Sequence, residues 1–179
     1  MKKRIIILWI IILVIADQGT KLIIANYFMD TRFDIIDSVI GIRPIFNEKY
    51  TFFNVLLGLN LEIFARVVFC ILVQFAIIFS YGYIKTIQQS STKLLDIAFI
   101  FGQSVAICVF CGFFFWKSGV LDFIYLHFFI IDMKDIYIKC FVMFFLINYL
   151  KNYSELKSPK LKFKDYLQKC YINIKNNQI

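Results

Sequence analysis

Three aspartates in the second half of the chain have the residue type and the spacing that acid–base chemistry requires. Asp122 lies among apolar neighbours in the run SGVLDF, and Asp132 and Asp135 are three residues apart in the run IIDMKD. Two carboxylates that lie close together cannot both ionise cheaply, so one keeps its proton while the other acts as a base. Such a pair provides a general acid and a general base at neutral pH. We therefore predict that Asp122 activates water together with an aspartate at the start of the next helix.

Structural and metal-binding interpretations of these aspartates compete with the acid–base one. Asp132 is a good N-cap, and Asp135 would sit in the first turn of the following helix, where the helix dipole favours an acid. The capping interpretation leaves Asp122 unexplained. Together with His127, the one histidine of the chain, the three aspartates could also hold a metal ion, but ligands on a short loop are an unspecific signal. We favour the aspartyl pair and expect neither a metal nor another cofactor.

A further acid and a base lie inside the first apolar run. Asp17 and Lys21 are four residues apart, so they share one face of a helix, and the acid precedes the base as the helix dipole prefers. They could form a self-neutralising pair near the outer interface, with Lys21 snorkelling to the surface. Alternatively, they hold an outer loop or a polar group of a substrate in place.

The composition is far more apolar than that of a soluble domain. Of the 179 residues 60% are hydrophobic and 18% are charged, whereas soluble domains average nearer 45–50% and 25%. A soluble fold of this size could not bury so many apolar side chains, because a large share of a small fold is surface. The net charge of +8 comes mostly from Lys and Arg that flank the apolar runs. That pattern is typical of the cytoplasmic side of a membrane protein, and we expect no nucleic acid partner.

The apolar runs predict an all-α membrane protein with four transmembrane helices. The expected spans are about residues 5–25, 63–84, 94–116 and 136–150. Between the first two, Asn26–Asn60 mixes charged residues with short β-branched and aromatic stretches around Gly41 and Pro44. We expect this segment to form a small extracytoplasmic β-cradle or an amphipathic surface segment.

An even number of spans places both termini on the same side of the membrane. Because the basic residues gather on the side of the termini, we predict a multi-pass protein of the cell membrane with both termini cytoplasmic. Residues 1–150 would form the membrane domain, and residues 151–179 a basic cytoplasmic tail with an amphipathic stretch around 161–174. The tail either lies on the anionic inner leaflet or remains a free polar segment.

The motifs, taken in order, resemble those of the signal peptidase II (lipoprotein signal peptidase) family. ADQGTK, which contains Asp17 and Lys21, resembles the family's Asp-x-x-Thr-Lys. Asn47 in PIFNEKYTFF matches an Asn that precedes the second span. SGVLDF and IIDMKD resemble Gly-x-Val-x-Asp-Phe and Phe-Asn-x-Ala-Asp, which carry the family's catalytic aspartates. The resemblance covers roughly residues 5–150.

The resemblance implies an aspartic endopeptidase with Asp122 and Asp135 as the catalytic residues. Its substrate would be a diacylglyceryl-modified prolipoprotein, cut just before the lipidated Cys. Membrane lipids would surround the enzyme. We expect the enzyme to be a monomer. The residues expected to support the site or bind substrate are Asp17, Lys21, Asn47 and Asp132.

The chain departs from the family pattern in three places. Asp132 replaces the Asn of Phe-Asn-x-Ala-Asp, and Glu48-Lys49-Tyr50 replaces a Gly-Ala-Ala stretch. The Gly-Asn-x-x-Asp-Arg motif of the third span has no counterpart in FGQSVAICVFCGFFFW. These departures leave open an alternative, a catalytically inactive homologue that acts as a membrane binding or assembly protein. A small transporter or channel subunit is less favoured, because the second and third spans carry almost no polar residues.

Overall fold

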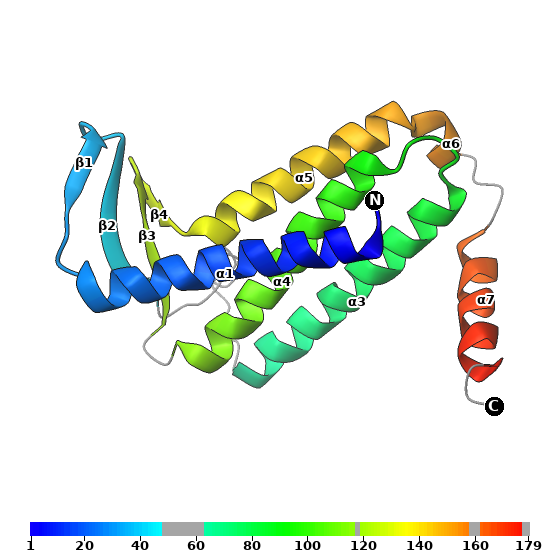
Figure 1. Ribbon diagram of the computed structural model, residues 1–179, viewed down its shortest axis with the longest axis horizontal. Coiled ribbons are helices and arrows are strands. Elements are labelled where there is room, and N and C mark those ends of the chain that lie inside the picture. Colours follow the sequence, from blue (N-terminus) through cyan, green and yellow to red (C-terminus); the bar gives the residue numbers. More distant parts are fainter. Residues whose placement is uncertain (48–62, 117–118, 158–161, 177–179) are drawn as a thin grey trace.

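The computed structural model describes residues 1–47, 63–116, 119–157 and 162–176, and Figure 1 shows the arrangement of its elements. In chain order the helices and strands are α1 (Lys3–Tyr27), β1 (Phe33–Ile36), β2 (Ile40–Asn47), α3 (Ile63–Ile87), α4 (Lys93–Phe115), β3 (Val120–Leu126), β4 (Phe129–Ile131), α5 (Met133–Lys151), α6 (Tyr153–Lys157) and α7 (Phe163–Asn176). The long helices form a bundle, and the strands form a sheet at one end of it (Figure 1). The chain is therefore mostly helical, with a small antiparallel sheet.

Three of the helices are long and apolar enough to cross a membrane. They are α1, α4 and the part of α3 from Val67 to Ile87. Many large apolar side chains on them are exposed in the isolated chain, as expected for surfaces that face lipid acyl chains. The first three predicted spans coincide with these helices. The fourth, residues 136–150, lies within α5, and its crossing of the membrane stays a prediction.

Helix α4 lies at the centre of the bundle and packs against α1, α3 and α5. The approach of α4 to α5 depends on Gly102, because a Cβ atom there would lie 3.1 Å from the ring of Phe141. At the end of the bundle far from the sheet, the buried Asp96 of α4 accepts hydrogen bonds from the Tyr81 hydroxyl (2.7 Å) and the Lys85 ammonium (2.6 Å). These bonds join the start of α4 to the end of α3.

The sheet has four antiparallel strands in the order β1-β2-β3-β4. Its first two strands come from the segment in which we predicted a β-cradle, and residues 48–62 of that segment lie outside the described residues. The last two strands come from residues 120–131, between the third and the fourth predicted span. The pairing of β2 with β3 joins residues about 80 positions apart, such as Asn47 and Val120, so no local pattern signals it.

An apolar cluster attaches the sheet to the helices. Leu121 and Phe123 of β3 pack with Ile24 of α1 and with Trp116, which directly follows α4. The indole Nε1 of Trp116 donates a hydrogen bond to Gln18 Oε1 at 3.0 Å. The cluster therefore fixes strand β3 relative to the ends of α1 and α4.

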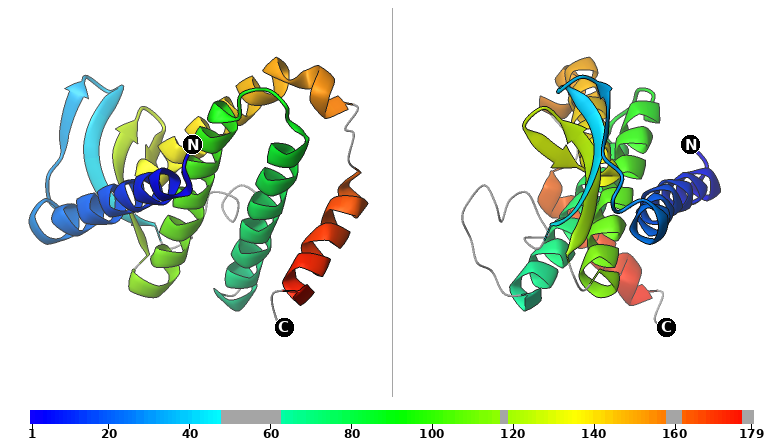
Figure 2. Two further views of the ribbon diagram at one scale, coloured as in Figure 1. Left: turned by 45° about the vertical axis from the view of Figure 1, so that its right-hand side comes forward. Right: turned by 90° about the vertical axis from the view of Figure 1, so that its left-hand side faces the viewer.

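Helix α7 corresponds to the amphipathic stretch expected in the tail. It lies beside α3 (Figure 2), where the ring of Tyr83 is 5.1 Å from that of Phe163 and 5.6 Å from that of Tyr166. The position of the tail relative to a lipid surface stays a prediction.

Candidate active site

Strand pairing places Asn47 and Asp122 on one face of the sheet. Asp122 of β3 lies opposite Ile45 of β2, so Asn47, two residues further along β2, is its diagonal neighbour. The amide Nδ2 of Asn47 donates a hydrogen bond of 2.9 Å to Asp122 Oδ2. Asp122 is buried, and its Oδ1 has no hydrogen-bond partner among the described residues. The described residues therefore leave the hydrogen-bonding capacity of that oxygen unused.

The first turn of α5 holds the other two aspartates in a reciprocal cap. Asp132 is the N-cap, and its Oδ1 accepts a hydrogen bond from the backbone N–H of Asp135 at 3.2 Å. In return, Asp135 Oδ2 accepts one from the backbone N–H of Asp132 at 3.3 Å. This is the capping box geometry, with Asp135 in the place usually taken by Glu or Gln. The capping interpretation of Asp132 is therefore confirmed.

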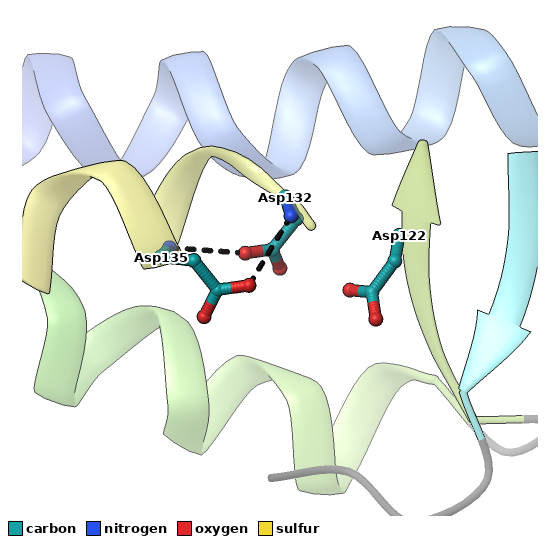
Figure 3. A group of neighbouring side chains, drawn as sticks. All are labelled: Asp122, Asp132 and Asp135. Carbon is teal, nitrogen blue, oxygen red and sulfur yellow. Dashed lines mark hydrogen bonds between the residues drawn. The ribbon is translucent and has the colours of Figure 1, made fainter. Parts of the chain in front are cut away.

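The three aspartates converge at the junction of the sheet and the bundle. Asp122 extends from β3 towards the first turn of α5, where Asp132 and Asp135 lie (Figure 3). One carboxylate oxygen from each of the three lies within 4.8 Å of the others. Two hydrogen bonds of about 2.8 Å that meet at one water span a similar distance. The structure thus brings Asp122 and Asp135 within reach of a shared water.

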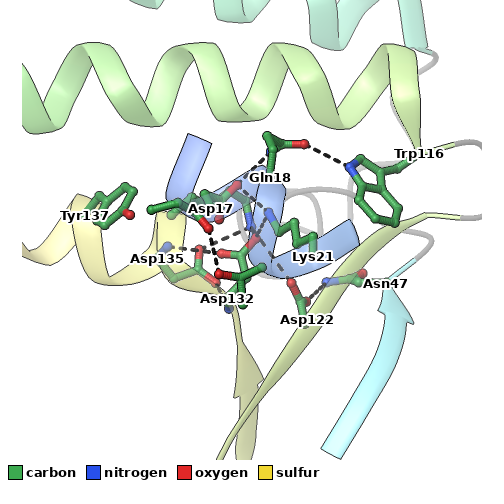
Figure 4. Close-up of polar contacts among 12 residues, drawn as sticks. Asp17, Gln18, Lys21, Asn47, Trp116, Asp122, Asp132, Asp135 and Tyr137 are labelled. Carbon is green, nitrogen blue, oxygen red and sulfur yellow. Dashed lines mark hydrogen bonds and ion pairs between the residues drawn. The ribbon is translucent and has the colours of Figure 1, made fainter. Parts of the chain in front are cut away.

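Asp17 and Lys21 of α1 are fully buried and continue this polar cluster (Figure 4). Lys21 Nζ lies 2.8 Å from Asp17 Oδ2 and 2.6 Å from Asp132 Oδ2. Buried charges persist only when they are paired, so the Lys21 ammonium ties the start of α5 to α1. The ion pair expected between Asp17 and Lys21 is therefore present, but Lys21 is buried and does not snorkel to the surface.

Sequence comparison identifies the family of the chain. The sequence model described as signal peptidase (SPase) II matches residues 9–151. The chain belongs to the signal peptidase II family. The resemblance of its motifs is thereby confirmed, and at the level of the family the chain is a membrane protease that processes lipoproteins. No curated protein sequence matches the chain significantly.

Solved structures of other proteins share the fold. One, described as a bacterial membrane enzyme structure by the in meso method at 1.9 Å resolution, has a TM-score of 0.63 and 22% identity, over 84% of this chain and 95% of that one. A second of the same description, at 2.3 Å resolution, has a TM-score of 0.62 and 21% identity, over 89% and 96% of the two chains. At these identities the likeness concerns the fold alone.

A lysine that our sequence analysis did not single out lies among the three aspartates. Lys134 Nζ is 2.8 Å from Asp132 Oδ2, 3.6 Å from Asp135 Oδ1 and 4.0 Å from Asp122 Oδ1. The signal peptidase II motif quoted above has an alanine at this position. A charged residue in place of that alanine, between two aspartates, was the signal that could have identified it.

The electrostatic environment differs between Asp122 and Asp132. Burial raises the pKa of Asp122 to about 6, although Lys134 and the Asn47 hydrogen bond lower it. Burial also acts to raise the pKa of Asp132, but Lys134 and Lys21 outweigh it and the net direction is downward. Asp132 therefore stays ionised at neutral pH, whereas Asp122 takes up a proton more readily than an ordinary aspartate.

The site also bears on the metal alternative. Asp122, Asp132 and Asp135 are close enough for one oxygen from each to face a common cation, but the Lys134 ammonium lies within 4.0 Å of an oxygen of each. His127, the fourth residue of that alternative, lies in the turn after β3, where its Nδ1 is 2.8 Å from the Ser38 carbonyl oxygen. His127 therefore does not lie within the cluster of the three aspartates.

Helix α4 contributes no charged side chain to the cluster among the described residues. It passes the cluster with the buried Cys108, which lies next to Asp17. Asp17 Oδ1 is buried and has no hydrogen-bond partner in the described part of the chain. Lys134 and Asp132 instead add one base and one acid on the α5 side of the site.

Proposed function

We propose that this chain is an aspartic endopeptidase that removes signal peptides from diacylglyceryl-modified prolipoproteins, with Asp122 and Asp135 as its catalytic residues. The observation that carries this proposal is the approach of their carboxylate oxygens to within 4.8 Å at the end of an apolar bundle. Two carboxyl groups at that separation can hold one water between them, one as the acid and the other as the base.

In this mechanism the ionised carboxylate takes a proton from water, and the water oxygen bonds to the scissile carbonyl carbon. The protonated carboxyl group donates a hydrogen bond to the carbonyl oxygen. The peptide C–N bond then breaks as the leaving amine takes up the proton that the first carboxylate accepted from water. Asp132 is not a member of the pair, because two ammonium groups lie within 2.8 Å of its Oδ2 and favour its ionised form. Its role, with Asp17 and Lys21, is to fix the first turn of α5.

The surroundings of the site support a lipid-anchored substrate. The site lies where the sheet meets the bundle (Figure 4), and the helices that lead away from it expose large apolar side chains. A substrate whose acyl chains stay in the bilayer would meet such a site with its peptide at the membrane face. We further propose four spans with α5 as the last, both termini cytoplasmic in the cell membrane, residues 151–179 as a cytoplasmic tail, and a monomeric enzyme.

The test is cleavage of a lipidated precursor by the purified protein in detergent. We expect Asp122→Asn and Asp135→Asn each to abolish cleavage, because either change removes a group that exchanges the proton of the attacking water. Asp37→Asn, in the exposed turn between β1 and β2, is the matched control and should cleave like the wild type. Undiminished cleavage by Asp122→Asn or by Asp135→Asn would show that Asp122 and Asp135 do not act together as the catalytic pair.

A second candidate function rests on the third span. Because α4 offers no Asn, Asp or Arg beside Asp17, the chain could be an inactive homologue that binds lipidated or apolar peptides or assembles with a partner. That function predicts that the Asp122→Asn variant complements a deletion strain as well as the wild type does, while the purified wild type cleaves no precursor.

A further inference from the structure

Lys134 holds the first turn of α5 and faces the catalytic pair. Its side chain is nearly fully buried, with 9% exposed, and its ammonium group makes one short ion pair, with Asp132 at 2.8 Å. The oxygens of Asp135 and Asp122 lie further away, at 3.6 and 4.0 Å. A buried ammonium that is hydrogen-bonded to one acid and only near two others acts on those two mainly through its charge.

We propose that Lys134 is a positioning residue whose charge sets the pH range over which the Asp122–Asp135 pair carries a single proton. The inference rests on the proposed function, and it adds to that function a residue where the family motif has an alanine.

The charged and titratable groups around the pair come from four elements. They are Asp17 and Lys21 of α1, Asp122 itself on β3, Asp132, Lys134, Asp135 and Tyr137 of α5, and Cys108 and Cys111 of α4. Within this set the Lys21 ammonium pairs with Asp17 at 2.8 Å and with Asp132 at 2.6 Å. Among the described residues, Lys134 is therefore the cation whose ammonium lies within 4.0 Å of both members of the pair.

The sign of the effect follows from the charges. A cation favours the ionised form of a nearby carboxyl group, so Lys134 lowers both apparent pKa values of the pair. Without Lys134, a carboxylate oxygen of Asp132 still lies within 4.8 Å of one oxygen of each member, and its negative charge disfavours ionisation of the pair. Activity needs one proton on the pair, so both limbs of the pH profile should move to higher pH when the ammonium is removed. At these distances we expect a shift of about one pH unit or more.

The experiment compares the pH dependence of kcat for the full-length wild type, Lys134→Met and Lys134→Arg in detergent. Lys134→Met should shift both limbs upward by about one unit or more, and Lys134→Arg, which keeps the charge, should stay close to the wild type. Lys139→Met, five residues further along α5 at an exposed position, is the matched control and should leave the profile unchanged. Should Lys134→Met not fold, Lys134→Gln, which keeps a hydrogen-bond donor for Asp132, takes its place.

A second readout separates this inference from the proposed function. Infrared titration of the protonated carboxyl band reports the ionisation of Asp122 directly, with Asp122→Asn as the reference that removes its signal. The midpoint should rise in Lys134→Met whether or not the protein cleaves a precursor. If the midpoint is unchanged in a folded Lys134→Met variant, the role of Lys134 is overturned. If the midpoint rises in Lys134→Met but the wild type cleaves no precursor, only the proposed reaction is overturned.

Discussion

At the scale of single residues, the site keeps a carboxyl group in an environment that opposes its ionisation. Asp122 is 4% exposed, with one hydrogen bond from Asn47 and an Oδ1 that has no hydrogen-bond partner in the described ranges. Its pKa of about 6 lies above that of an aspartate in the unfolded chain, near 3.9. The folded protein therefore binds a proton more tightly than the unfolded chain does, and its stability falls as the pH rises from about 4 to 6.

This linkage predicts that Asp122→Asn stabilises the protein at neutral and alkaline pH. The neutral amide removes the cost of a buried carboxylate, which amounts to at most about 3 kcal/mol for a shift of this size. Thermal unfolding in detergent should give a higher Tm for the variant than for the wild type at pH 8, and nearly equal values at pH 4. The exposed Asp37→Asn should show no such difference, and an Asp122→Asn variant less stable than the wild type at pH 8 would contradict the argument.

At the scale of elements, the site exists because two packing contacts fix the first turn of α5 relative to β3. One is the apolar cluster of β3 with Ile24 and Trp116, and the other is the close approach of α4 to α5 at Gly102. The buried Lys21 adds an ion pair between α1 and the N-cap Asp132. A change in the distance between α4 and α5 would therefore move Asp135 relative to Asp122.

A pair of glycine substitutions tests the packing of α4 against α5. An alanine in a helix interior is favoured over glycine by about 1 kcal/mol. Gly19→Ala in α1 should raise the free energy of unfolding by about this amount, since no heavy atom of the described chain lies within 4 Å of the added Cβ. In Gly102→Ala this stabilisation should be cancelled, because the Cβ would lie 3.1 Å from the Phe141 ring and overpacking costs about 1–3 kcal/mol. Thermal unfolding should rank Gly19→Ala above the wild type and Gly102→Ala at or below it.

At the scale of the whole molecule, the two ends of the bundle are formed by different parts of the chain (Figure 1). The sheet and the aspartates occupy one end, and the start of α1, the link between α3 and α4, and α6 occupy the other. At that second end Gln88 Nε2 donates a hydrogen bond to Asn148 Oδ1 of α5 at 3.3 Å. If the bundle spans a membrane, the three aspartates and the start of α1 face opposite sides of it.

Reporter fusions test this topology. A fluorescent protein that folds only in the cytoplasm should fluoresce when fused after residue 179, and alkaline phosphatase at that position should be inactive. Phosphatase inserted in the turn between β1 and β2 should be active, because the sheet would then lie outside. An active phosphatase after residue 179 would mean that α5 does not cross, and would leave three spans.

The sequence alone was sufficient for the properties that depend on composition and on local patterns. Apolar runs of the length of a bilayer located α1, α3 and α4, and the Asp132 N-cap was correctly predicted from its position before an apolar helix. The order of short motifs identified the family, and the family match to residues 9–151 confirmed it. Each apolar run and each single motif lies within about 25 consecutive residues, so tertiary contacts are not needed to recognise it.

Only the tertiary structure decided which groups meet. The pairing of β2 with β3 brings Asn47 to Asp122, and the packing of α1 and of α5 against α4 brings Lys21 to Asp132, across 75 and 111 positions of the chain. Lys134 is adjacent to Asp135 in sequence, yet its role depends on Asp122, which arrives on another element. Electrostatic interactions depend on distance in space and on burial, and neither quantity can be read from a linear order of residues.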